Sequence, residues 1–107
     1  MAKLERHLKG NFNDILSRCD AAIMKSVSAS LEDGSDYEFA GVRVAVRVYE
    51  RYSLFGKNRV SLNLTLAGRD GDVFLSAIAS GGSQAVFFKI NTLGERNFLD
   101  TLSDNLD

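Results

Sequence analysis

The sequence has 107 residues, with 13 Lys+Arg, 14 Asp+Glu, one His, one Cys and no Pro or Trp. Hydrophobic residues make up 45% and charged residues 25%, which is globular composition and argues against intrinsic disorder. The formal net charge of -1 gives no general attraction for polyanions, so we expect no membrane binding and regard nucleic acid as a poor candidate partner.

The chain is long enough for one hydrophobic core and too short for two, which predicts a single α+β domain over residues 1–107. No apolar run approaches the roughly 20 residues that span a bilayer, and the opening MAKLERHLKGN lacks the apolar stretch of a signal peptide. One Cys cannot form an internal disulfide, which indicates a reducing, cytoplasmic compartment.

The first predicted elements are a strand and a helix. Residues 2–9 alternate, with Leu4 and Leu8 on one face, which predicts a short strand near a sheet edge. Gly10 breaks this pattern, and Asn11 is suited to cap the helix that follows. Helical spacing over about four turns predicts an amphipathic helix, with its apolar stripe formed by Phe12, Ile15, Leu16, Cys19, Ile23 and Val27.

A weaker strand is predicted for residues 27–32, and a loop for the acidic, turn-forming residues 33–41. Residues 42–52 then alternate Val with Arg and Tyr, and residues 59–67 alternate Leu with polar residues. We expect both aliphatic faces to meet one core, and a three-residue loop at 54–56 (Leu-Phe-Gly) gives that parity. This register sets Val48 opposite Leu62 and turns Arg47 away from the helices.

Two further turns extend the meander. The two-residue hairpin signal at 70–71 (Asp-Gly) places Leu75 beside Leu66 and Ala77 beside Leu64. A second signal, Gly-Gly at 81–82, predicts a strand over 83–90 with Val86 opposite Ala77.

The last predicted element is a second helix, which opens with a capping box at Thr92 and Glu95. The order predicts an α+β fold, β-α-β(4-5)-α, in which a single twisted antiparallel sheet carries two helices packed on one face. This topology resembles the TATA-binding-protein-like or helix-grip architecture, a resemblance that implies no function. The apolar stripe of the second helix is Phe98, Leu99, Leu102 and Leu106.

The uncovered face of this sheet is the main candidate site. An apolar patch rimmed by Arg is typical of a covered surface, and Arg and aromatic residues are enriched in interfaces. The residues that the predicted register places there are Arg43, Arg47, Tyr49, Arg51, Arg59, Asn63, Phe74, Ile78 and Phe87.

Three occupants of that face stay open at this point. The loop at 33–41, with Tyr37 and Phe39, could fold over it; a homodimer could form through it; or a separate small ligand or protein partner could bind it. The surface depends on parity, because it does not exist if Arg47 faces the helices and Val48 faces outward.

A second candidate lies at the end of the valine-rich strand. The predicted register puts Glu50 and Tyr52 on the aliphatic side, with Asn58 nearby, where a groove between sheet and helices could hold a small molecule. A desolvated Glu50 would suit a general acid or base, but an ion pair with a neighbour such as Arg59 is the interpretation that we favour.

The remaining reactive residues favour structural roles. Cys19 lies on the apolar helix stripe and is expected to be a buried thiol, and His7 is expected to face solvent. One His and one Cys cannot form the usual Cys/His zinc site, and the acidic residues at 32–38 indicate a solvated turn. We therefore predict no catalytic residue, metal or cofactor, and a non-enzymatic binding or interaction module.

Five stretches resemble an uncharacterised family of small bacterial proteins, classed as a domain of unknown function. The stretches are AKLERHLKGNF, VRVAVRVYERYS, NRVSLNLTL, SAIASGGSQAVFFKINTLGE and NFL, which together reach across nearly the whole chain. The resemblance implies a bacterial cytosolic setting and assigns no activity or catalytic residue.

Overall fold

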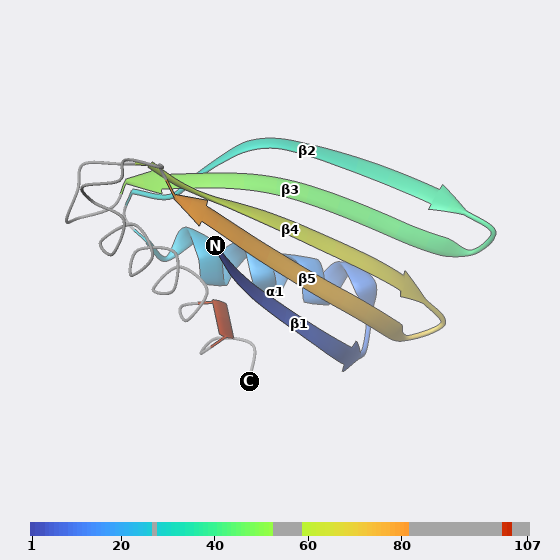
Figure 1. Cartoon of the computed structure of the whole chain (residues 1–107). Helices are drawn as coiled ribbons and strands as arrows, with labels where there is room; N and C mark the ends of the chain where they lie inside the picture. Colours follow the sequence, from blue (N-terminus) through green and yellow to red (C-terminus); the bar gives the residue numbers. More distant parts are fainter. Residues whose placement is uncertain (27, 53–58, 82–101, 104–107) are drawn as a thin grey trace.

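Five strands and one helix make up most of the computed structural model, which describes residues 1–26, 28–52, 59–81, 102 and 103. The strands form one open antiparallel sheet in the order β1-β5-β4-β3-β2, and α1 lies across one face of it (Figure 1). The fold is therefore α+β. The elements are β1 (Ala2–Lys9), α1 (Phe12–Met24), β2 (Ser30–Phe39), β3 (Val42–Tyr52), β4 (Arg59–Arg69) and β5 (Asp72–Gly81).

The link from β1 to α1 confirms the sequence prediction. Gly10 adopts a φ of +146°, a conformation that side-chain-bearing residues rarely take. The side chain of Asn11 then accepts a hydrogen bond of 3.0 Å from the backbone N–H of Asp14, satisfying one of the orphan donors at the helix start. β1 is an edge strand, as expected.

The hairpin between β4 and β5 also has the predicted register. Asp70 and Gly71 both have positive φ, 52° and 82°, as a two-residue type I′ turn requires. Leu66 consequently pairs with Leu75, and Leu64 with Ala77.

The predicted register between β3 and β4 is wrong by one residue. Val48 pairs with Asn63, and Tyr49 takes the place opposite Leu62. Since Tyr52 pairs with Arg59, the connection spans residues 53–58 and has the opposite parity to a three-residue loop; the residues at 54–56 lie outside the described part of the chain. A one-residue shift turns every side chain of a strand to the other face.

The prediction of a loop at 33–41 is wrong, because residues 30–39 form the edge strand β2. β2 joins β3 through Ala40 and Gly41, whose φ values of 53° and 82° again describe a two-residue turn. Tyr37 pairs with Val44 and Phe39 with Val42, so these two rings belong to the sheet and do not fold over it. Pairing with β3 has overridden the turn-forming composition of this segment.

The predicted pairing of a strand over 83–90 with β5 is wrong, because β1 occupies that edge of β5 from Asp72 to Ala79. Residues 83–90 themselves, and the predicted second helix apart from Leu102 and Ser103, lie outside the described residues. Further on, Leu102 is fully buried in the core, and Ser103 accepts a hydrogen bond of 3.4 Å from Arg6.

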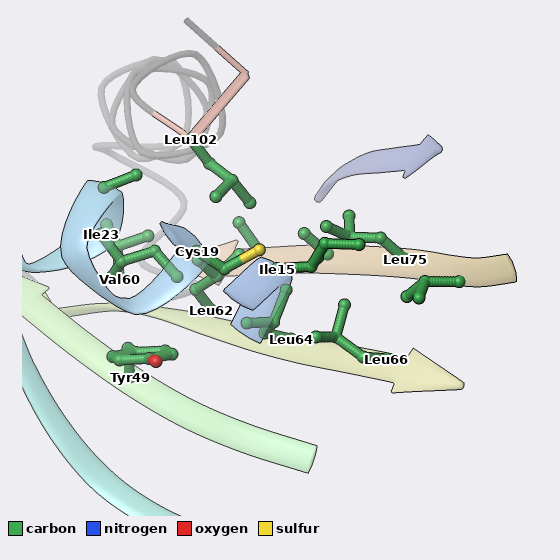
Figure 2. Close-up of a cluster of buried hydrophobic side chains, with 14 residues drawn as sticks. Ile15, Cys19, Ile23, Tyr49, Val60, Leu62, Leu64, Leu66, Leu75 and Leu102 are labelled. Atoms are coloured by element: carbon green, nitrogen blue, oxygen red, sulfur yellow. The ribbon is translucent and has the colours of Figure 1, made fainter. Parts of the chain in front are cut away.

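The hydrophobic core lies between α1 and the sheet (Figure 2). On α1 the buried residues recur at helical spacing, and on β4 and β5 they alternate, so both periodicities converge on one layer. The core consists of Ile15, Cys19, Ala22, Ile23, Tyr49, Val60, Leu62, Leu64, Leu66, Val73, Leu75, Ala77, Ala79 and Leu102. Among the described residues, no helix is long and apolar enough to cross a bilayer.

Candidate interaction surface

The corrected register moves Arg43, Arg47, Tyr49 and Arg51 from the outward face to the side of the sheet that carries α1. Arg43 donates a hydrogen bond of 2.7 Å to Asn13 and lies 4.4 Å above the centroid of the Phe12 ring. Arg43 therefore packs the first turn of α1 onto β3, and its guanidinium does not line an outer surface.

Arg47 and Arg51 also form hydrogen bonds within the protein. The Arg47 side chain crosses Gly34 on β2. There it donates a hydrogen bond of 3.0 Å to the Asp36 carboxylate and one of 3.2 Å to the Ser35 carbonyl. Arg51 donates a hydrogen bond of 3.3 Å to the hydroxyl of Ser26, which lies beyond the end of α1. Burial lowers the pKa of the Arg51 guanidinium. The arginine-lined contact surface expected from the sequence is therefore absent.

Even-numbered residues of β3 take its place on the face turned away from α1, which we call the open face. Rings from β2 extend this surface: Tyr37 and Phe39 are 64% and 70% exposed and stack with their centroids 6.5 Å apart. The apolar residues of the open face are Tyr37, Phe39, Val42, Val44, Val46, Val48, Ala67, Phe74 and Ile78. Phe74, Ile78, Asn63 and Arg59 lie on this face as predicted.

The open face also contains a hollow of about 340 Å³ near the β4–β5 turn. Its floor is formed by the small Ala67, and Val42 and Phe74 stand on either side of it. The His7 imidazole lies 5.2 Å from the Phe74 ring, so it faces outward from β1 beside this hollow. A side chain from a partner would meet these apolar groups here, together with the charged Arg69, Asp70 and Asp72 that also line the hollow.

Glu50 and Tyr52 lie on the open face, so among the described residues they form no groove with α1, contrary to the prediction. Glu50 forms an ion pair of 2.7 Å with Arg59, which confirms the structural interpretation. Arg59 also lies 3.5 Å from the Tyr52 hydroxyl, and these two partners raise the pKa of Arg59. The adjacent cavity, about 110 Å³, is smaller than the roughly 300 Å³ of a usual ligand pocket.

Sequence reasoning missed the valines, Tyr37 and Phe39 as members of the outer surface. A signal for them was present, because Tyr37 and Phe39 flank Glu38 with the two-residue period of a strand immediately before Ala40 and Gly41. Of the remaining candidates, Asn58 and Phe87 lie outside the described residues.

A family model matches residues 1–107, and so covers all the elements described above. The chain belongs to DUF6054, a family of unknown function. No curated protein matches this sequence. Membership of DUF6054 thus confirms the resemblance to an uncharacterised family and assigns no chemistry to the open face, whose role has to be argued from its own residues.

Proposed function

We propose that this DUF6054 protein is a non-enzymatic interaction module that binds other protein molecules through the open face of its sheet. The observation that carries the proposal is the continuous apolar surface formed by the valines of β3 and the exposed rings of Tyr37 and Phe39. A sheet face left to solvent is ordinarily polar in alternation, whereas an extended apolar one generally has an occupant.

The composition of the patch favours a protein surface over a lipid or polyanion. The four valines and Phe74 are only partly exposed, so they provide a flat apolar floor, and the two aromatic side chains of β2 stand beside it. Charged residues lie toward the edges, with Lys3 and Lys9 on β1 and Asp33 on β2. An apolar centre with a charged rim of both signs is typical of protein interfaces.

Site-specific photo-crosslinking in the native host tests the proposal. A benzophenone amino acid placed at Tyr37 is expected to give covalent protein adducts, whereas the same group at Ala21, exposed on α1, is expected to give none. Adducts of either kind, with a second copy or with another protein, support an interaction surface. Absence of adducts at position 37, with the variant folded by circular dichroism, would contradict it.

For the C-terminal part of the chain we infer a second helix on the same face as α1. It would complete the TATA-binding-protein-like order of one strand, one helix, four strands and a second helix. The burial of Leu102 in the core and the contact of Ser103 with Arg6 on β1 support this inference. Amide hydrogen exchange over residues 92–103 tests it, since a packed helix protects those amides and a loop leaves them unprotected.

A second candidate function is small-molecule binding in a groove of about 330 Å³ between α1 and the β2–β3 hairpin. The groove combines an apolar wall, from Leu16 and Leu31, with the polar groups of Asp20 and Arg47. A fragment screen followed by amide chemical-shift mapping tests this role. Hits that move Leu31 and Arg47 amides, and are lost in Ser17→Trp, favour it; hits that map elsewhere argue against it.

A further inference from the structure

We infer that the occupant of the open face is a second copy of this chain, packed face to face about a two-fold axis that runs along the central strand β4. This inference rests on the proposed function and names the partner. It follows from the order of side chains in two rows across the sheet, those that begin at Lys3 and at His7, which are self-complementary when they are reversed.

The first row of the open face lies near the middle of β4. The register places Lys3, Ile78, Asn63, Val48 and Asp33 side by side, from β1 to β2. A two-fold axis along β4 sets each row against its own reverse, because it exchanges β1 with β2 and β5 with β3. Lys3 then meets Asp33 of the second copy, Ile78 meets Val48, and the Asn63 amides meet each other.

A second row lies four residues along each strand. It contains His7, Phe74, Ala67, Val44 and Tyr37. Reversal sets the His7 ring against the Tyr37 ring and Phe74 against Val44, while the small Ala67 lies on the axis. Apolar groups again meet apolar groups, and the exposed Tyr37 gains an aromatic partner.

The contact has the size of a weak, transient association. Five strands at about 4.8 Å spacing, over the seven residues from the Lys3 row to the Lys9 row, give a projected footprint of roughly 20 × 20 Å. An interface of that size belongs to the smaller class, burying less than about 1,200 Å² in total. We therefore expect a dissociation constant in the micromolar range.

Lys3 and Asp33 allow a test that no single-copy effect can imitate. They lie on opposite edge strands with three strands between them, about 19 Å apart across the sheet, so they do not touch within one copy. Both side chains are exposed, which makes substitution there compatible with folding. Any energetic coupling between the two positions must pass through a second molecule.

Sedimentation equilibrium of the full 107-residue chain measures the dimer directly. We expect the wild type to dimerise, and Lys3→Asp and Asp33→Lys each to raise the dissociation constant about tenfold, since each pair occurs twice in the dimer. The double variant Lys3→Asp/Asp33→Lys is expected to recover wild-type affinity. Glu38→Lys, exposed on the other face of β2, is the matched control and is expected to leave the dimer unchanged.

Cross-linking reports the axis itself. Thr65 lies on β4 between the two rows, so Thr65→Cys brings two thiols together across the interface. Facing sheets are about 10 Å apart, too far for a disulfide, so the probe is bismaleimidoethane. We expect covalent dimer from Thr65→Cys and none from Glu38→Cys; Cys19 does not interfere because it is fully buried.

A wild-type chain that stays monomeric up to about 1 mM would overturn the inference, as would a dimer in which the double charge variant is weaker than either single variant. The outcome remains separable from the proposed function. Photo-crosslinks at position 37 to a different protein, with a monomeric chain, would overturn the homodimer and support the interaction surface.

Discussion

The Tyr49 hydroxyl donates a hydrogen bond of 2.7 Å to the Asp20 carboxylate, joining the middle of β3 to the flank of α1. Tyr49 is fully buried, and burial together with this bond raises the pKa of its phenol. The contact explains why a strand with an uninterrupted valine face presents its other face to the helix. The Tyr49 ring and the aliphatic part of the Arg43 side chain fill the space beside α1. Their polar ends donate hydrogen bonds to Asp20 and Asn13 of the helix.

Tyr49→Phe tests that contact. It keeps the ring and removes the donor, so we expect the free energy of unfolding to fall by about 1.5 to 3 kcal/mol, the usual value of a hydrogen bond to a charged acceptor. Urea denaturation measures it. In an Asp20→Ala background the same substitution should cost almost nothing, and an undiminished cost there would show that the bond is not responsible.

Gly68→Ala is expected to destabilise the start of α1. A Cβ at this position would lie 2.6 Å from Cδ2 of Phe12 and 3.2 Å from Cγ2 of Val73. Overpacking of this kind costs about 1 to 3 kcal/mol, measurable by thermal unfolding. Combined with Phe12→Leu, which shortens the opposing side chain, the cost should shrink; additivity of the two substitutions would argue against the contact.

Gly34→Ala addresses the path of Arg47. The added Cβ would lie 3.0 Å from Cδ of Arg47, so the Arg47 side chain must shift and its ion pair with Asp36 is weakened. Because this ion pair is partly exposed, we expect a loss of only about 0.5 to 1 kcal/mol. The loss should disappear in an Arg47→Ala background, and a similar loss in both backgrounds would place the cause in the β2 backbone.

Cys19 predicts how stability depends on pH in the alkaline range. Desolvation raises the pKa of its thiol to about 11, against an ordinary value of 9.0 in the unfolded chain. This contribution to folding is complete below pH 9 and is lost as the pH rises toward 11, because the unfolded chain releases the proton first. Two pKa units correspond to about 2 to 3 kcal/mol.

Denaturant titrations between pH 8 and 11 measure this dependence. Cys19→Ala is the comparison, and its unfolding free energy should fall less steeply over the same interval. An equal fall of the unfolding free energy with pH in the two proteins would mean that burial does not raise the pKa of the Cys19 thiol.

The β4–β5 hairpin was predictable residue by residue because Asp70 and Gly71 permit only a tight turn, and a turn of known length fixes the register. The helix start was predictable for the same local reason, since Asn11 supplies its cap within three residues. Both signals are contained in the segment that they organise.

The face of β3 was not predictable in this way. Its alternation of Val and Arg defines two faces but not which one meets the core, and the predicted parity depends on a three-residue loop at 54–56. The groups that decide the question, Asn13 and Asp20 on α1, become partners of Arg43 and Tyr49 only after the helix has docked. The buried face of such a strand can therefore be assigned only from its contacts with the rest of the fold.

The central claim is that the valines of β3 face away from α1. A ¹³C-edited NOESY spectrum with assigned methyl groups tests it most directly. We predict cross-peaks from the Val44 methyl groups to the Tyr37 ring on the neighbouring strand, and none from Val44 or Val48 to the methyl groups of Ile15 and Ile23. Cross-peaks between these valines and the two helix isoleucines would contradict the register, the open face and the homodimer together.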